Sequence, residues 1–161
     1  MKNMQPEFRL AVPDDSRDCL IIRGQTRENA ASAEHLAAIG VTEESWAEGV
    51  GNGSLVGYVC TESDSIVGYC FGRTASGEVI VLALLPTHEG DGIGRHLMDL
   101  VVKHFFDAGH RRLVLGCNPN PAVRSYGFYR HLGWTSTGNF DRAGDEILEL
   151  LPSAANDLRP N

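Results

Sequence analysis

The chain has 161 residues, of which 42% are apolar and 22% charged. This length suits one domain with a sizeable hydrophobic core, and the composition excludes an intrinsically disordered chain. The 14 basic and 21 acidic residues give a net charge of -7, which excludes a non-specific binder of the nucleic-acid backbone. No segment has the roughly 20 apolar residues of a membrane helix, and the first nine residues lack the apolar core of a secretory signal. We therefore expect a cytoplasmic protein with no nucleic-acid and no membrane partner.

The four cysteines predict neither a metal site nor a disulfide framework. They lie scattered among apolar residues, at Cys19, Cys60, Cys70 and Cys117. The Cys-x-x-Cys spacing of a zinc site is absent, so we interpret them as reduced, buried side chains of a cytosolic protein. A cysteine hydrolase built on Cys117 would need a positioned histidine, and the sequence identifies none.

The N-terminal third predicts one strand and three short helices. Residues 8–12 form the strand, and Asp14 or Asp15 is expected to cap a helix that runs to about Arg23. Residues 26–50 have weak helical periodicity around a central glycine, which predicts two further short helices.

Three β-rich runs follow, at residues 55–61, 66–73 and 78–85. Their spacers are short and polar or contain glycine, which predicts hairpins and an antiparallel meander. The third run is the most apolar, so we expect it to be a central strand buried on both faces of the sheet.

The periodicity then changes from two to 3.6 residues, which predicts an amphipathic helix that ends at Gly109. One stripe of this helix is apolar: Leu97, Met98, Val101, Val102, Phe105 and Phe106. A strand at residues 113–117 follows, and then a helix with Asn120 as its N-cap and Pro121 as its first residue. We expect this helix to end near Gly133.

Residues 134–138 and 146–151 predict a closing hairpin. Strands in antiparallel runs around one strand–loop–helix–strand crossover predict an α/β fold. The expected architecture is a single domain with a mixed, largely antiparallel central sheet and helices on both faces.

The most informative segment is the glycine loop, residues 86–94 (PTHEGDGIG), between the apolar strand and the amphipathic helix. Glycines at positions 90, 92 and 94 let backbone N–H groups approach an anion, and a helix N-terminus adds partial positive charge. A phosphate or pyrophosphate is therefore the natural ligand, and a merely flexible turn is the alternative. A Walker loop would need Gly-Lys-Ser/Thr, and a dinucleotide fingerprint would need glycine where Arg95 stands.

Two segments together resemble the GCN5-related N-acetyltransferase (GNAT) superfamily. The first resembles its acetyl-CoA loop, usually Gln/Arg-x-x-Gly-x-Gly/Ala, and contains Leu84, Pro86, Glu89, Gly92 and Gly94. The second resembles its aromatic-Tyr-x-x-x-Gly-Phe segment and contains Phe128, Tyr129, Gly133 and Trp134. The resemblance covers residues 8–151, which we expect to be one acyl-CoA-dependent N-acetyltransferase domain, and leaves residues 152–161 as a polar, mobile tail.

The resemblance implies that acetyl-CoA is the acyl donor and that no metal takes part. In the family, the strand that corresponds to residues 78–85 carries a bulge and splays from the next strand, and the pair forms the CoA cleft. The CoA-binding positions would be Leu82, Leu84, Glu89, Gly90, Asp91, Gly92, Ile93, Gly94 and Arg95. The reaction would be direct attack of a primary amine of a small molecule or protein on the thioester in a ternary complex. The resemblance also leaves room for a homodimer.

Two catalytic candidates follow from the resemblance. Tyr129 matches the family tyrosine near the CoA sulfur and would protonate the leaving thiolate, although its ring could simply pack against the sheet. Glu78 maps onto the position of a glutamate that acts as general base in the family. The alternatives are that Glu78 is only a solvated acid at the start of a strand, and that a chain of waters takes the proton instead. His88 reads as a solvated loop residue.

The sequence leaves the roles of several charged residues open. Glu89 stands where the family usually has Gln or Arg, and Asp91 adds a second acid, so two carboxylates near a pyrophosphate would weaken CoA binding. This departure motivates the alternative of a non-catalytic acyl-CoA-binding regulatory or interaction domain. Arg124 and Arg130 would either meet phosphate on the adenosine or face water. Acids that would form either an acceptor wall or ordinary solvated faces are Glu28, Glu34, Glu43, Glu44, Glu48, Asp141 and Asp145.

Overall fold

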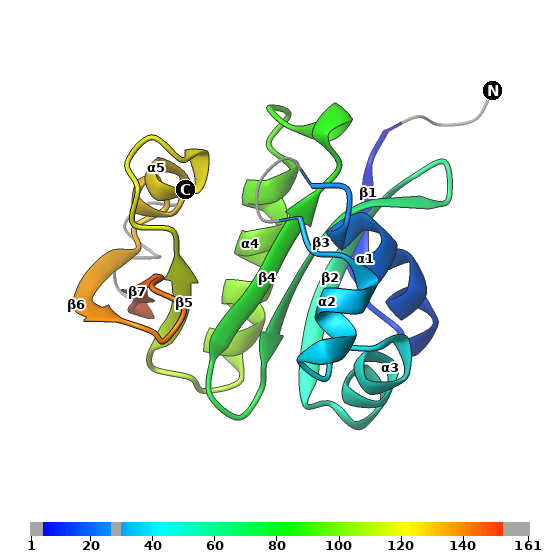
Figure 1. The fold of residues 1–161 in the computed structure, drawn as a ribbon, viewed down its shortest axis with the longest axis horizontal. Coiled ribbons are helices and arrows are strands. Elements are labelled where there is room, and N and C mark those ends of the chain that lie inside the picture. The colour runs from blue at the N-terminus through cyan, green and yellow to red at the C-terminus, as the bar shows by residue number, and fades with distance from the viewer. Residues whose placement is uncertain (1–4, 27–29, 153–161) are drawn as a thin grey trace.

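The computed structural model describes residues 5–26 and 30–152. These residues form a seven-stranded sheet with the order β1-β2-β3-β4-β5-β7-β6, in which only the β4–β5 pair is parallel. Helices lie on both faces of the sheet (Figure 1). The expected α/β class, with a mixed and largely antiparallel sheet, is confirmed.

The elements follow the predicted order. The strands are β1 (Glu7–Leu10), β2 (Leu55–Glu62), β3 (Ser65–Arg73), β4 (Glu78–Leu84), β5 (Leu113–Cys117), β6 (Thr135–Phe140) and β7 (Glu146–Leu150). The helices are α1 (Ser16–Arg23), α2 (Ala33–Ala38), α3 (Glu43–Asn52), α4 (Ile93–Asp107) and α5 (Arg124–His131). Two short 3-10 turns, Pro13–Asp15 and Pro86–His88, precede α1 and α4.

The prediction that an aspartate side chain caps the first helix is wrong. Asp15 occupies the N-cap of α1, but its side chain makes no capping bond to that helix. Its carboxylate accepts two hydrogen bonds from Arg9 at 2.8 and 2.9 Å and one from the Val12 amide at 2.8 Å. Burial alone would raise the pKa of Asp15, but these bonds outweigh it and lower the pKa. The acid therefore fastens β1 to the start of α1.

The core has two layers, one on each face of the sheet. On one face, the apolar stripe of α4 packs over the central strands, and Leu97, Val101 and Phe105 are almost fully buried. On the other face, Cys19 and Ile22 of α1 pack with residues of β2 and β3. The first layer also includes buried residues of β5 and β7, so it continues across the separation of β4 and β5.

The most buried strand is β3 rather than β4. Residues 66–72 of β3 are all buried, whereas most of β4 is only half-buried. The expectation that β4 would be covered on both faces is therefore wrong, although β4 does lie at the centre of the sheet. The reason is that β5 stays beside β4 at only one position.

The last helix begins later than predicted. The Asn120 side chain accepts a hydrogen bond from the Ala122 amide at 2.9 Å, which forms a turn, and the N-cap of α5 is Val123. The helix ends before Gly133, whose φ is +99°, as predicted. Strand β7 then inserts between β5 and β6, so the closing hairpin is confirmed.

The four cysteines are free and buried, as predicted. No helix among the described residues is long and apolar enough to cross a membrane.

Candidate functional site

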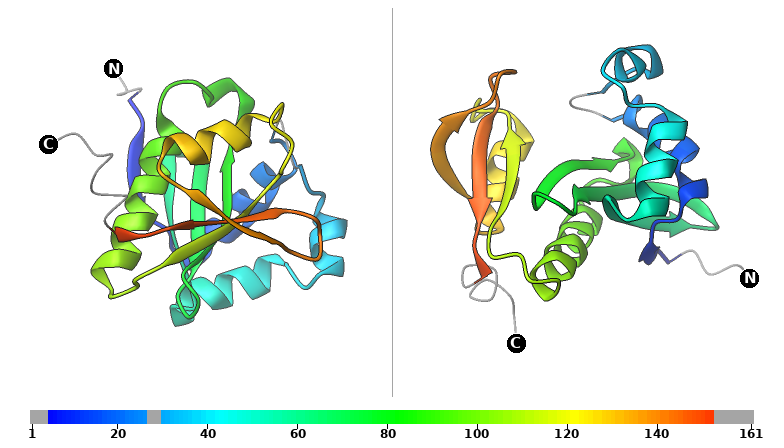
Figure 2. Two further views of the ribbon diagram at one scale, coloured as in Figure 1. Left: turned by 90° about the vertical axis from the view of Figure 1, so that its left-hand side faces the viewer. Right: turned by 90° about the horizontal axis from the view of Figure 1, so that it is seen from below.

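Strands β4 and β5 separate from each other along their length. They are paired only at Glu78 and Val114, near the start of each strand. The β3–β4 register shifts next to Phe71 and Gly72, which marks a bulge in the sheet before the separation. Figure 2 shows the result, since β5, β7 and β6 stand apart from β1–β4.

A cavity of about 340 Å³, here called the interstrand cavity, lies beside the separated end of β4. It is lined by Thr26, Leu82, Leu84, Glu89, Gly90, Gly92, Gly94, Arg95, Arg124, Ser125 and Phe128. Seven of the nine predicted CoA-binding positions are therefore brought together in one place. The other two are not in the lining, because Ile93 is buried in the core at 3% exposure and Asp91 points to solvent.

The glycine loop turns the start of α4 toward this cavity. Gly90 and Gly92 have φ values of +88° and +82°, a left-handed conformation that side chains other than glycine rarely adopt. The first hydrogen bond within α4 runs from the His96 amide to the Gly92 carbonyl at 3.0 Å. The amides of residues 93–95 therefore have no carbonyl partner inside the helix. They form a ready site for an anion.

The inner wall of the cavity is apolar. Leu82 and Leu84 of β4 reach into it and also pack against the core under α4. Phe128 of α5 faces them, because a Cβ at Gly94 would lie 3.7 Å from its ring and 3.9 Å from Leu82. Three elements thus converge at Gly94, and a larger residue there would narrow the cavity.

An ion pair spans the rim of the cavity. Arg124 at the start of α5 donates from Nη1 to Oε2 of Glu89 at 2.9 Å. The Glu89 side chain is 17% exposed and that of Arg124 is 56% exposed. The sequence analysis did not pair Glu89 with Arg124, and the structure places this cation beside the Glu89 carboxylate.

Tyr129 is not in the lining of the cavity; it is a half-buried residue of α5 that packs against the core under α4. Its ring contacts the core cluster under α4 and the edge of the Phe128 ring, with 5.3 Å between centroids. Burial raises the pKa of its hydroxyl, and the nearby thiols of Cys70 on β3 and Cys117 on β5 raise it further. The phenol therefore keeps its proton at neutral pH.

Glu78 lies at the paired end of β4 and β5, away from the residues that line the cavity. Its carboxylate is 45% exposed and forms an ion pair with Arg73 at 3.5 Å. Because Val79 belongs to the core under α4, the alternation of a strand directs Glu78 to the opposite face of the sheet. Glu78 and Tyr129 are therefore on different faces of the same separated strand pair.

His88 is not a freely solvated residue. Its Nε2 lies 3.3 Å from Oε2 of Glu62, and its Nδ1 lies 2.9 Å from the Thr87 hydroxyl. The ring ties the glycine loop to the end of β2.

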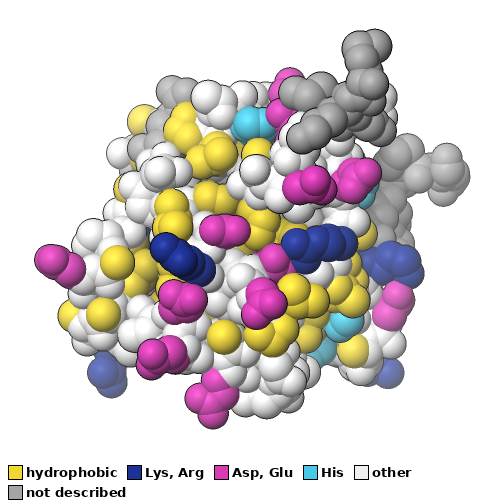
Figure 3. All heavy atoms as spheres, turned by 90° about the vertical axis from the view of Figure 1, so that its right-hand side faces the viewer, with side chains coloured by type: hydrophobic (Ala, Val, Ile, Leu, Met, Phe, Trp, Pro, Cys, Tyr) yellow, Lys and Arg dark blue, Asp and Glu magenta, His cyan; other side chains and the backbone are white. Residues whose placement is uncertain are grey.

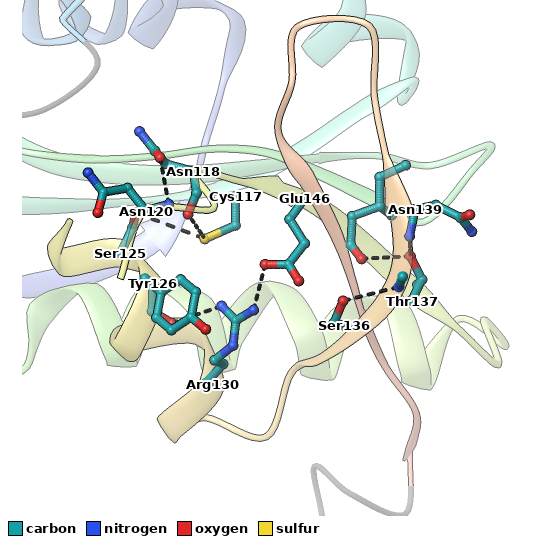
Figure 4. A network of polar contacts seen from close by, with 12 residues as sticks. Cys117, Asn118, Asn120, Ser125, Tyr126, Arg130, Ser136, Thr137, Asn139 and Glu146 are labelled. Atoms are coloured by element: carbon teal, nitrogen blue, oxygen red, sulfur yellow. Dashed lines mark hydrogen bonds and ion pairs between the residues drawn. The ribbon is translucent and has the colours of Figure 1, made fainter. Parts of the chain in front are cut away.

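A polar network braces α5 against the closing hairpin (Figure 4). Arg130 donates to Glu146 at 2.5 Å and stacks over the Tyr126 ring at 3.6 Å. Hydrogen bonds from Ser136 and from Arg130 lower the pKa of Glu146. Arg130, expected either to meet phosphate or to face water, instead links α5 to β7 and does not line the cavity, and Tyr126 packs against it.

Cys117 has the environment of a core residue rather than of a nucleophile. Its thiol is 2% exposed and donates to the Asn118 carbonyl at 3.5 Å, beside Ser125 at 4.0 Å. Burial raises the pKa of the thiol, which keeps it protonated and unreactive at neutral pH.

Acidic side chains approach the open face of β5. A Cβ at Gly116 would lie 3.1 Å from an Asp141 carboxylate oxygen and 3.4 Å from the Cβ of Asp145. Burial, and then the charge of Asp141, raise the pKa of Asp145.

Among the other acids predicted for an acceptor wall, Glu28 lies outside the described residues. The remaining four, on α2 and α3, are exposed. Figure 3 shows the side of the molecule on which α1–α3 lie, and the acids there are scattered among apolar side chains rather than gathered into one wall.

The cavity also contains residues that the sequence did not single out. Thr26 and Ser125 carried no motif, and Phe128 was recognised only as part of the aromatic segment. Arg124 was left between two roles. The sequence did not show that the glycine loop contacts α5, and this contact was needed to assign these residues to the cavity.

The comparisons with known proteins agree on one family. A family model described as the acetyltransferase (GNAT) family matches residues 13–134. No curated protein matches the sequence significantly. Solved structures that share the fold include PaiA N-acetyltransferase from Thermoplasma acidophilum in complex with coenzyme A. Its TM-score is 0.76 at 17% identity, over 92% of this chain and 99% of that one.

Two further structures have the same fold. YncA, a putative acetyltransferase from Salmonella typhimurium with acetyl-CoA, has a TM-score of 0.70 at 17% identity, over 98% of this chain and 96% of that one. The ribosomal-protein-S18-alanine N-acetyltransferase from Escherichia coli has a TM-score of 0.68 at 16% identity, over 91% and 94%.

Proposed function

Because the chain belongs to the GNAT family of acetyltransferases, we propose that it moves an acetyl group from acetyl-CoA to a primary amine. Members of this family take acetyl-CoA as donor and use no metal, and similar structures hold CoA or acetyl-CoA. The observation that carries the proposal is the interstrand cavity, where the start of α4 meets the first residues of α5 and the end of β4 that has separated from β5.

The donor would lie along this cavity in two parts. Its diphosphate would accept hydrogen bonds from the amides of residues 90–95, since these precede or begin the helix and carry partial positive charge. Its pantetheine arm would run between β4 and β5 against Leu82 and Leu84. Strand backbone left unpaired by the separation supplies the hydrogen-bonding groups that such an arm needs.

The chemistry would be attack of a neutral amine on the thioester within a ternary complex. We propose that Tyr129 protonates the leaving thiolate, because its raised pKa keeps the proton available and a thiol of pKa about 8.5 needs little help. A backbone N–H near the bulge would bind the oxyanion. We propose Glu78 as the base, and because it lies at the paired end of β4 and β5, outside the cavity lining, it would act through water.

The alternative was a domain that binds acyl-CoA without turnover. It rested on the charges of Glu89 and Asp91, but Glu89 is paired with Arg124 and Asp91 points away from the cavity. Catalytic transfer is therefore the better-supported function. The buried free thiols support a cytoplasmic location. A homodimer, if it forms, would have the outer strands β1 and β6 available for pairing.

The test is a panel of primary amines, amino acids and N-terminal peptides incubated with acetyl-CoA. Mass spectrometry follows the acceptors, and thiol release is followed in parallel. We expect the acetyl mass to appear on an amine nitrogen, with thiol released in equal amount. Saturable CoA binding without thiol release for any acceptor would instead support the non-catalytic alternative.

A further inference from the structure

The rim of the interstrand cavity combines charges from two elements that the separation of β4 and β5 brings face to face. Glu89 belongs to the glycine loop, whereas Arg124 is the first residue of α5. Both side chains line the cavity, and they meet at 2.9 Å. The ion pair therefore connects the two walls of the cavity at its opening.

Arg124 is in an unfavourable place for a cation unless it meets an anion. The start of a helix carries partial positive charge, and acids rather than bases stabilise it. The first turn of α5 contains no acid, and its N-cap makes no side-chain bond. The Glu89 carboxylate offsets the charge of Arg124 by reaching across the cavity from the loop.

A guanidinium can also hold more than one anion. It has five N–H donors in a rigid fork, and its bond to Glu89 uses Nη1. Glu89 thus orients the fork, and at 17% exposure it is the more buried partner. Across the opening, Gly92 and the amides of residues 93–95 present the remaining positive potential of the rim.

We propose that Arg124 binds the diphosphate of the donor from the wall opposite the glycine loop, and that Glu89 is a positioning residue that holds Arg124 in place and moderates its charge. This inference rests on the proposed function. In it, the loop position where a cation would be expected is acidic, and the cation comes from α5 instead. The donor is then gripped from both sides of the separated strands.

Arg124→Met tests the contact, because it keeps the aliphatic stem and removes the charge. Binding of CoA, dephospho-CoA and acetyl-pantetheine is measured by calorimetry at low salt. We expect about a tenfold loss of affinity for both nucleotides, because Arg124 is more than half exposed, and none for acetyl-pantetheine, which lacks the diphosphate. The matched control is Arg111→Met, an exposed arginine outside the cavity, which should change nothing.

The three ligands separate the possible outcomes. A loss seen with CoA but not with dephospho-CoA would overturn the diphosphate assignment in favour of the 3′-phosphate. Equal affinity of Arg124→Met and the wild type for CoA would overturn the contact altogether. Failure of the wild type to bind any of the three ligands would instead refute the proposed function.

The role of Glu89 is tested by a double-mutant cycle with Glu89→Gln, which keeps the shape and the acceptor oxygen but removes the charge. We expect Glu89→Gln alone to tighten CoA binding several-fold, most visibly at low salt. Arg124→Met should then cost more in the Glu89→Gln background than in the wild type, because the full charge of Arg124 acts on the diphosphate. Additive effects of the two changes would show that Glu89 does not act through Arg124.

Discussion

Tyr129 combines a retained proton with a half-buried position on α5, next to Phe128 in the wall of the interstrand cavity. Its hydroxyl is close to thiols on both β3 and β5, and burial keeps it protonated. Tyr126, one turn earlier on α5, is instead stacked against Arg130 and braced to the hairpin. The two tyrosines share a helix but differ in environment, which makes them a natural pair for comparison.

Replacing Tyr129 with Phe keeps the ring and its packing but removes the proton. We expect kcat to fall roughly ten- to hundredfold when chemistry limits turnover, at the lower end of the usual range for acid catalysis because thiolates leave easily. The melting temperature and the affinity for acetyl-CoA should change little. Tyr126→Phe is the control and should keep wild-type kcat.

Steady-state and single-turnover kinetics on both variants provide the measurement. Wild-type kcat in Tyr129→Phe, with chemistry shown to be rate-limiting, would contradict the acid role. A large loss of donor affinity with kcat preserved would make Tyr129 a binding residue.

The glycine loop and α4 act as one element in which backbone conformation prepares an anion site. Gly92 is the N-cap of α4 and makes no side-chain cap, since it has no side chain. A Cβ at Gly92 would meet nothing within 4 Å, so the space beside it is open to a ligand. Its left-handed φ of +82° nevertheless makes any other residue there strained.

Gly92→Val should therefore have two separable effects. Backbone strain should lower the free energy of unfolding by about 1–2 kcal/mol, and the side chain should block the approach of the diphosphate and weaken CoA binding tenfold or more. Gly138 on β6 has the same φ of +82° and also has open space around it, but it does not line the cavity. Gly138→Val thus reproduces the strain alone.

Denaturant unfolding and calorimetric titration of CoA distinguish the two effects. Comparable loss of stability in both variants, with loss of binding only in Gly92→Val, is the expected result. If both variants bind CoA as the wild type does, the glycine loop does not hold the diphosphate.

Elements that depend on local chemistry could be predicted from the sequence. The strand-to-helix change at the glycine loop was visible because glycine spacing and apolar periodicity are local properties. Asn120 was misjudged as a helix cap because an Asn side chain satisfies a turn equally well, and it does so here with Ala122. The Glu89–Arg124 pair joins residues 35 positions apart, and only the placement of α5 beside the loop brings them together.

At the scale of the whole molecule, β4 and β5 are unpaired beyond Glu78 and Val114, and this gap in an otherwise continuous sheet is called the seam below. The core under α4 still joins the two parts, since it includes Leu113, Leu115 and Leu148 as well as the α4 stripe. The general architecture could be predicted from the order of strands and helices. The early end of the β4–β5 pairing was expected only through the family resemblance, and the exposure of β4 was not predicted, because it depends on a bulge whose register only the folded sheet shows.

This seam predicts how the donor should affect stability. A ligand that binds only the folded state stabilises it by about 2.7 kcal/mol at 100 times its Kd, which for a domain of this size corresponds to roughly 5 to 10 °C in Tm. Amides of residues 80–85 and 115–117 that point into the seam should also gain protection from hydrogen exchange, because the pantetheine arm would take the place of the missing strand pairing.

Thermal melts and hydrogen-exchange mass spectrometry with and without CoA measure both effects. The 68–72 segment of β3, which is buried and paired with both β2 and β4, is the internal control and should change only with global stability. A rise in Tm without added protection along the seam would show that CoA binds elsewhere on the molecule.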